Sequence, residues 1–367
     1  MARIDKNGVG HIPASEKLIK SEAFYGRTDL RSIVIPDSVT EIGPAAFSGC
    51  TSLTSIVIPD SVTKIRYDAF RDCTSLTSIE IPNSVTEIAD GAFRGCTGLT
   101  SIVVSGGNKV YDSRNGCNAI VHTITNTLKT GCKNTVIPDS VTKIGYDAFS
   151  GCTGLTSIVI PDSVTKIRDG AFSGCTGLTS IVIPTSVTEI GYDAFSGCTG
   201  LTSIVIPDSV TVINVVAFSG CTGLTSIVIP TSVTEIWHDA FSGCTGLTSI
   251  VIPDSVTEIG GFSGCTGLTS IVIPDSVTEI GDDAFSGCTS LTSIVIPDSV
   301  WEIKENAFLH CSSLRRISFL GSVRTIHKSA FKECESLEQI CVPANKIEYY
   351  KMLLPAKLHK LIEANTL

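Results

Sequence analysis

A unit of 23 residues recurs along this chain of 367 residues and constrains its fold more than any other feature. Its fullest form is Leu-Thr-Ser-Ile-Val-Ile-Pro-Asp-Ser-Val-Thr-Glu-Ile-Gly-x-Asp-Ala-Phe-Ser-Gly-Cys-Thr-Gly. A short, fixed period is typical of a solenoid, in which each repeat forms one coil and buries its apolar side chains against the coils next to it. The coils begin at Leu30, Leu53, Leu76, Leu99, Leu155, Leu178, Leu201, Leu224, Leu247, Leu268, Leu291, Leu314 and Leu337.

The alternation inside one coil predicts two short strands. In the coil that begins at Leu201, the alternation favours a strand with Leu201, Ile204 and Ile206 inward and Thr202, Ser203 and Val205 outward. A corner follows at Pro207, then a second short strand over residues 210–213 and one helical or 3-10 turn over residues 214–221. The sequence therefore predicts a repeat solenoid with a parallel β-sheet on one face.

Charge and composition exclude several classes of function. The net charge of -9 is spread thinly along the repeats, and no basic stripe suggests a nucleic-acid partner or an anionic membrane surface. No run of about 18 apolar residues predicts membrane insertion. Residues 1–8 show no export signal, so the residues alone predict a soluble chain that stays in the cytoplasm.

Twelve of the fifteen cysteines follow the repeat, and the set does not form a pairing pattern. One per coil at an equivalent position predicts a column of buried free thiols that act as small apolar side chains. No metal-binding Cys-x-x-Cys motif occurs. The column consists of Cys50, Cys73, Cys96, Cys152, Cys175, Cys198, Cys221, Cys244, Cys265, Cys288, Cys311 and Cys334.

Departures from the repeat suggest three segments: an N-terminal cap and partial repeat over 1–29, the solenoid over 30–343, and a C-terminal capping helix within 344–367. Residues 346–361 predict an amphipathic helix, interrupted at Pro355, that covers the last open strand edge. Basic residues on this helix leave a partner-binding helix as the alternative. They are Lys351, Lys357, His359 and Lys360.

An irregular insert at residues 105–135 interrupts the solenoid. Its alternating runs, 119–123 and 127–131, indicate a hairpin. The insert is either an irregular coil spliced into the stack or a loop that grips a ligand. The polar residues available to such a loop are Tyr111, Asp112, Arg114, Asn115 and Asn118.

No catalytic, cofactor-binding or metal-binding motif occurs, so we expect a non-enzymatic protein without a cofactor. Three successive coils depart from the repeat and predict a local binding patch. Its candidate residues are Val212, Asn214, Val215, Val216, Trp237, His238, Gly260 and Gly261. The outward sheet face is a second candidate surface, through Thr179, Val182, Thr202, Val205, Thr225, Val228, Thr248 and Val251.

The repeat Leu-x-Ser-Ile-x-Ile-Pro-x-Ser-Val-Thr-x-Ile-x-x-x-Ala-Phe-x-x-Cys closely resembles the BspA-like leucine-rich repeat family over about nine-tenths of the chain. The resemblance implies a leucine-rich-repeat solenoid in a bacterial protein that is secreted or on the cell surface. It also implies adhesion to host matrix or plasma proteins. Two alternatives remain open: an intracellular scaffold, and a carbohydrate-binding module that uses the aromatic side chains of Tyr67, Tyr146, Tyr192 and Trp237.

Overall fold

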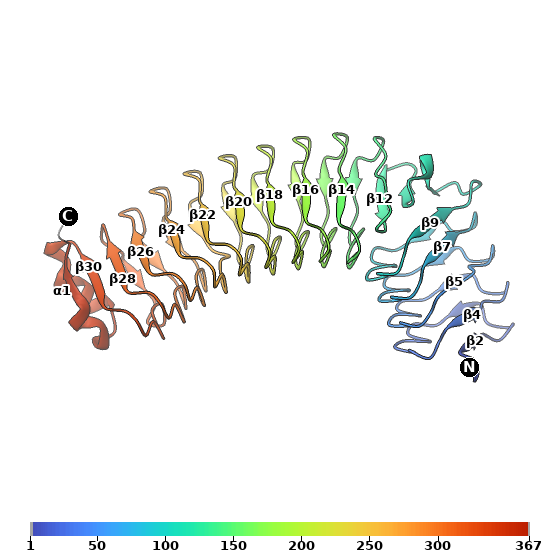
Figure 1. Ribbon diagram of the computed structural model, residues 1–367, viewed down its shortest axis with the longest axis horizontal. Coiled ribbons are helices and arrows are strands. Elements are labelled where there is room, and N and C mark those ends of the chain that lie inside the picture. Colours follow the sequence, from blue (N-terminus) through green and yellow to red (C-terminus); the bar gives the residue numbers. More distant parts are fainter. Residues whose placement is uncertain (1–2, 366–367) are drawn as a thin grey trace. The chain divides into compact units, whose positions relative to one another are not determined.

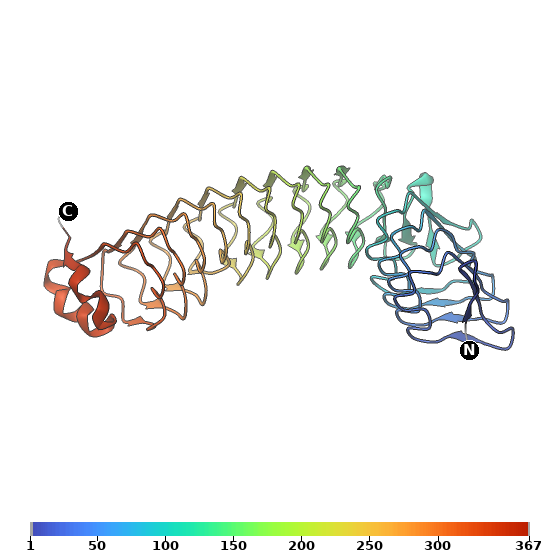
Figure 2. The ribbon, with the colours of Figure 1, turned by 60° about the horizontal axis from the view of Figure 1, so that its bottom comes forward.

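The structure, a computed structural model, describes residues 3–365, so residues 1–2 and 366–367 of the two predicted end segments lie outside the described residues. Contacts between residues divide the chain into two compact units, residues 1–186 and 187–367. Each unit is a stack of coils with short parallel strands and few helices, as Figures 1 and 2 show. The predicted repeat solenoid is confirmed.

Unit 1 contains two kinds of parallel ladder. The first strands of the coils pair as β2 with β4, β7 with β9, and β14 with β16. The second strands pair in the order β3-β5-β6-β8 and, after the insert, β12-β13-β15. The elements are β1 (Arg3–Ile4), β2 (Val9–His11), β3 (Leu18–Ile19), β4 (Ser32–Val34), β5 (Glu41–Ile42), β6 (Lys64–Ile65), β7 (Ser78–Ile81), β8 (Glu87–Ile88), β9 (Ser101–Val104), β10 (Tyr111–Asp112), η1 (Arg114–Gly116), β11 (Ile120–His122), β12 (Thr127–Thr130), β13 (Lys143–Ile144), β14 (Ser157–Val159), β15 (Lys166–Ile167) and β16 (Ser180–Val182).

The insert forms an antiparallel meander. Strand β11 pairs with β10 on one side and with β12 on the other. The second of these pairs is the expected hairpin, with Ile120 opposite Thr130 and His122 opposite Thr127. Because β12 then pairs in parallel with β13, the insert begins the ladder of second strands that follows it.

Unit 2 repeats the same two ladders. First strands pair as β18-β20, β22-β24 and β26-β28-β30-β31, and second strands pair as β19-β21 and β23-β25-β27-β29. The elements are β17 (Glu189–Ile190), β18 (Ser203–Val205), β19 (Val212–Ile213), β20 (Ser226–Val228), β21 (Glu235–Ile236), β22 (Ser249–Val251), β23 (Glu258–Ile259), β24 (Ser270–Val272), β25 (Glu279–Ile280), β26 (Ser293–Ile296), β27 (Glu302–Ile303), β28 (Arg316–Phe319), β29 (Thr325–Ile326), β30 (Gln339–Val342), η2 (Ala344–Lys346), α1 (Ile347–Leu353), η3 (Ala356–Leu361) and β31 (Ile362–Ala364).

Each coil turns its apolar side chains inward as predicted. Leu201, Ile204 and Ile206 are buried, whereas Val205 is 63% exposed. The corner at Pro207 is closed by a hydrogen bond from the amide of Val210 to the Pro207 carbonyl (3.0 Å). The first strand therefore contributes one face to the core and one to the surface.

The helical or 3-10 turn expected after each second strand is built as a series of reverse turns. The amide of Ala217 donates to Asn214 (3.2 Å) and that of Ser219 to Val216 (3.1 Å). A helix cannot continue because Val216 and Gly220 have φ of 49° and 68°. Other amides instead bond to the next coil, as from Phe218 to the Ala240 carbonyl (2.8 Å).

Phenylalanine and cysteine form buried columns in both units. Neighbouring rings stack with centroids 5.3 Å apart for Phe24 and Phe47, and 5.5 Å apart for Phe218 and Phe241. The cysteines are free thiols, as predicted. Most thiols of the column lie near the phenylalanine carbonyl of the preceding coil, as Cys244 does at 3.1 Å from Phe218, so they donate to a buried acceptor as well as filling space. Cys152, which follows the insert, lies 3.9 Å from the Gly131 carbonyl instead.

The C-terminal segment breaks at Pro355 as predicted, with an α-helix before the proline and a 3-10 helix after it. Helix α1 ends at Leu353, and the residue before Pro355 is extended, with φ of -94° and ψ of 147°. Proline disfavours a helical conformation at the residue before it, which explains the break. Strand β31, rather than the helix, pairs with the outer edge of β30.

Candidate functional site

A groove of about 670 Å³ opens in unit 2 at the coil of residues 247–267. This coil is 21 residues long, two shorter than its neighbours. The missing pair follows the second strand, where the coil runs Ile-Gly-Gly-Phe instead of Ile-Gly-Asp-Asp-Ala-Phe. The deletion removes two side chains from the surface and brings the predicted residues Trp237, His238, Gly260 and Gly261 into one groove.

Gly261 closes the short coil without breaking the stack. Its carbonyl accepts the amide of Phe241 (2.8 Å), the bond that an alanine carbonyl accepts in other coils. Its φ of +91° suits glycine, and a Cβ there would lie 2.8 Å from the Trp237 carbonyl oxygen and 3.0 Å from the Ala240 nitrogen. The backbone ladder therefore continues beneath the groove.

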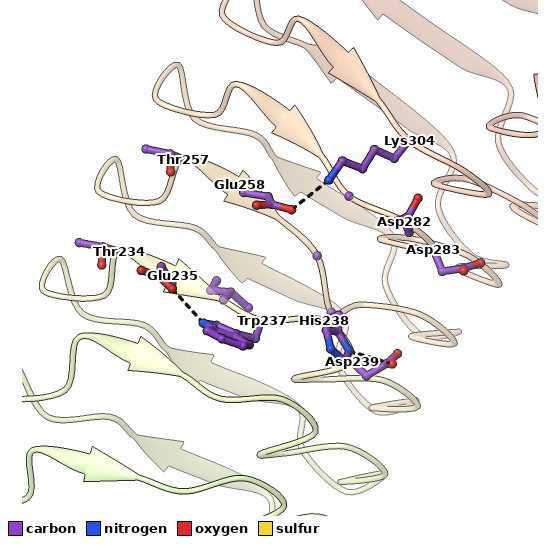
Figure 3. A pocket seen from close by; sticks show the side chains of 14 residues that line it. Thr234, Glu235, Trp237, His238, Asp239, Thr257, Glu258, Asp282, Asp283 and Lys304 are labelled. Atoms are coloured by element: carbon purple, nitrogen blue, oxygen red, sulfur yellow. Dashed lines mark hydrogen bonds and ion pairs between the residues drawn. The ribbon is translucent and has the colours of Figure 1, made fainter. Parts of the chain in front are cut away.

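The groove lies between side chains of different coils. Figure 3 shows Trp237 and Glu235 on one side, with Glu258 and Lys304 on the other. Trp237 is 47% exposed, and its indole Nε1 donates to Glu235 (2.9 Å). This bond fixes the ring at the rim of the groove, where an aromatic face is available to a partner.

The groove is strongly acidic. Five carboxylates line it, against the single ammonium of Lys304. Lys304 pairs with Glu279 and lies 3.7 Å from Glu258. Burial raises the pKa of Glu258, as does the nearby Glu279 carboxylate, while Lys304 opposes the shift. The lining carboxylates are Glu235, Asp239, Glu258, Asp282 and Asp283.

The position that follows each second-strand isoleucine, which we call the post-strand position, shapes this surface. Trp237, Gly260, Gly281 and Lys304 occupy it in four successive coils. The two glycines leave the space between the indole and the ammonium open. The sequence analysis predicted Trp237 and Gly260 as site residues but not Lys304. The signal that could have identified Lys304 is that it replaces the glycine found at the post-strand position in many other coils.

The four other residues of the predicted patch lie outside this groove. Val212, Val215 and Val216 are half-buried, and the Asn214 side-chain amide donates to the Ile190 carbonyl (2.7 Å). Val216 has a φ of 49° where most other coils carry Asp, Asn or Gly, as Asn306 does at 54°. A β-branched residue is rare in this conformation, so strain accompanies the substitution.

The outward sheet face is exposed in both units. The valine at the second outward position is 79% exposed at Val182 in unit 1, and 61% exposed at Val228 in unit 2. Threonine hydroxyls of this face already donate within the stack, as Thr225 does to the Thr202 carbonyl (3.2 Å). The other residues predicted on this face are also exposed; they are Thr179, Thr202, Thr225, Thr248, Val205 and Val251.

The polar residues of the insert bond to the preceding coils or to one another. Tyr111 is buried, and its hydroxyl accepts the amide of Ile88 (2.9 Å). Asn118 accepts the amide of Ile102 and donates to the Thr100 carbonyl. Arg114 donates to Asp112 (2.8 Å), while Asn115 adopts a φ of 57° in η1. The insert thus resembles a spliced coil more than a ligand-gripping loop.

Among residues 3–365, no group of three or more His, Cys, Asp or Glu side chains is arranged to hold a metal ion. Within the same range, every helix is too short or too polar to cross a bilayer.

Comparison with known proteins identifies the repeat. A sequence profile of the BspA type leucine rich repeat region matches residues 17–130, 128–248 and 235–353. The comparison with curated proteins gives no match. A leucine-rich repeat protein from Bacteroides ovatus is similar, with 33% identity and a TM-score of 0.64 over 97% of this chain and 83% of that chain.

Two other solved structures are similar. A leucine rich cell surface protein from Faecalibacterium prausnitzii has 32% identity and a TM-score of 0.57, over 88% of this chain and 93% of that chain. The pneumococcal vaccine antigen PcpA shares the fold, with 18% identity and a TM-score of 0.51 over 99% of this chain and 80% of that one. The profile spans most of the repeats, and the chain belongs to the BspA-type leucine-rich repeat family.

Proposed function

We propose that this chain is a non-enzymatic interaction protein that binds a protein partner through the surface of residues 201–267, centred on Trp237. The observation that carries the proposal is the groove at the shortened coil, which combines an exposed indole with an opening lined by five carboxylates. Exposed aromatic side chains are frequent anchors of protein interfaces. A repeat scaffold makes such a site by local departures from its consensus.

Family membership supports a role in adhesion outside the cell. One similar structure, at 32% identity, is described as a cell surface protein. Host matrix and plasma proteins are therefore the first partners to test. A carbohydrate partner is less well supported, because the exposed aromatic rings do not form a continuous platform. Tyr67, Tyr146 and Tyr192 occupy a different repeat position from Trp237, and no two of them lie in adjacent coils.

The test is a binding panel of purified matrix and plasma proteins, read by surface plasmon resonance. Trp237→Ala should weaken binding to a partner by at least about tenfold, because anchors of this kind commonly contribute about 2 kcal/mol or more. Trp301→Ala is the matched control, since Trp301 is a second exposed tryptophan, 41% exposed.

Substitutions on the outward sheet face test the alternative binding surface. Thr202→Lys combined with Val205→Lys places charge on that face and leaves the groove intact. If these changes abolish binding while Trp237→Ala does not, recognition belongs to the sheet face and the proposal fails.

A further inference from the structure

The post-strand position holds a cation in other coils of this chain. In unit 1, Arg66 occupies it and lies between glutamates of the preceding and following coils, with Nε 2.6 Å from Glu41 and a terminal nitrogen 2.5 Å from Glu87. In unit 2, Lys304 occupies it and pairs with Glu279 of the preceding coil. The second-strand glutamates therefore form a cradle for a positive side chain at this position.

The coil of Gly260 has no cation at its own post-strand position, and Lys304 pairs with one of the surrounding glutamates, Glu279. The glutamates that correspond to Glu41 and Glu87 are Glu235 in the preceding coil and Glu279 in the following coil. The residue two positions before Gly260 is Glu258, where the coil of Arg66 has Lys64. The Gly260 position is thus surrounded by more negative charge than the position that Arg66 fills.

An aromatic ring borders the same position. Trp237 occupies the post-strand position one coil before Gly260 and lines the groove beside it. The chain already pairs a cation with an aromatic ring elsewhere: the guanidinium carbon of Arg168 lies 5.7 Å from the centre of the Tyr146 ring. A cation over Gly260 would meet both kinds of contact, carboxylates and an indole face.

We propose that the groove over Gly260 receives an arginine or lysine side chain of the protein partner. This inference rests on the proposed function and names the chemistry of its site. The carboxylates of Glu235, Glu258 and Asp282 supply charge complementarity, and Trp237 supplies the face on which a guanidinium stacks. The open floor accommodates the incoming side chain, since a Cβ on Gly260 would have no neighbour closer than 3.8 Å.

The first experiment needs no partner. Gly260→Arg places a guanidinium on the chain itself, where it should pair with Glu235 and Glu258, which line the groove, and Gly260→Gln is the neutral control of similar length. We expect the arginine variant to melt at a higher temperature than the glutamine variant, with the difference shrinking in high salt. An arginine variant that melts at or below the temperature of the glutamine variant would overturn the proposal.

The second experiment uses a short Gly/Ser peptide that carries arginines, with a citrulline peptide of the same sequence as the uncharged control. The emission of Trp237 reports binding in a Trp301→Phe background, because these are the two tryptophans of the chain. The arginine peptide should bind at least about tenfold more tightly than the citrulline peptide. Glu258→Gln combined with Asp282→Asn should remove that preference.

Other outcomes separate this inference from the proposed function. A partner protein that loses binding with Trp237→Ala, yet is insensitive to Gly260→Arg and to salt, would leave the proposed function intact and overturn the cation site. Equal binding of both peptides, no binding of either, or binding of neutral glycans that needs Trp237 but no carboxylate would also overturn it.

Discussion

The coils of Arg66 in unit 1 and Gly260 in unit 2 share one backbone design but present opposite surfaces. In the first, a guanidinium neutralises two glutamates of neighbouring coils. In the second, a glycine leaves Glu235 beside an open groove, while Glu279 pairs with Lys304. The interior does not differ, since phenylalanine rings stack in both units. The comparison teaches that the core determines the fold, whereas the post-strand position determines the chemistry of the surface.

The largest expected effect tests whether the cores are equivalent. Burial raises the pKa of the Cys50 and Cys152 thiols to about 12. A rise of that size leaves roughly a thousandfold less thiolate than for an ordinary cysteine at neutral pH, so alkylation of these two thiols should be correspondingly slow. Burial likewise raises the pKa of the Cys265 and Cys288 thiols in unit 2, which should be protected too. Mass spectrometry after timed exposure to iodoacetamide measures this protection, and unfolding should release fifteen free thiols.

Rapid alkylation confined to the column cysteines of one unit would show that its core opens more readily than the other. Disulfides found in the unfolded chain would contradict the free-thiol column.

Removing a core ring should have the next largest effect. Phe47→Ala and Phe218→Ala each open a cavity in a stacked column and should lower the free energy of unfolding by about 3 to 5 kcal/mol. Chemical denaturation measures both, with the exposed Thr202→Ser as the control. A large difference between the two phenylalanine variants would break the equivalence of the cores.

The floor of the groove gives a smaller and more local effect. Gly261→Ala should lower the free energy of unfolding by roughly 1 to 3 kcal/mol, because it adds a Cβ at positive φ and 2.8 Å from the Trp237 oxygen. Gly260→Ala is the matched control and should have little effect. Similar melting temperatures for the two variants would show that the short coil closes in another way.

One substitution should stabilise the chain. Val216→Asn replaces a β-branched residue at a φ of 49° with one that tolerates the left-handed region, which should gain roughly 1 kcal/mol. Asn306→Val, the reverse change at an equivalent position, should lose a similar amount. Differential scanning calorimetry measures both, and a loss on Val216→Asn would argue against strain at this residue.

The smallest effect is a dependence on pH. The folded-state pKa of Glu258 is raised, so its contribution to stability is present at pH below its ordinary pKa and declines as the pH rises through the raised value. The facing groups are Glu279 and Lys304. Thermal melts from acid to neutral pH should therefore show Glu258→Gln becoming slightly more stable relative to wild type. An unchanged difference across this range would contradict the raised pKa.

Much of this structure is encoded in sequence signals that act over a few residues. The 23-residue period and the alternation around Leu201 predict the coil and its buried face correctly. The two-residue deletion at Gly260 and Gly261 also marks the groove. Turn geometry is not predicted, because alternating φ signs at residues such as Val216 replace the expected helical turn. The charge of the groove combines the carboxylates of Glu235 and Glu258 with the ammonium of Lys304, which lies two coils after Glu258. No pattern within a few residues of the sequence reveals that these side chains lie close together.

The terminal strands described above bear on self-association. Strand β1 pairs with β2, and β31 pairs with β30, so neither first-strand ladder ends in the long bare edge that a second copy could extend. The second-strand ladder of unit 1 begins at β3, which has only two residues and makes a poor template. Among residues 3–365, the strands that end the first-strand ladders are only two and three residues long, so they offer little backbone for a filament to extend.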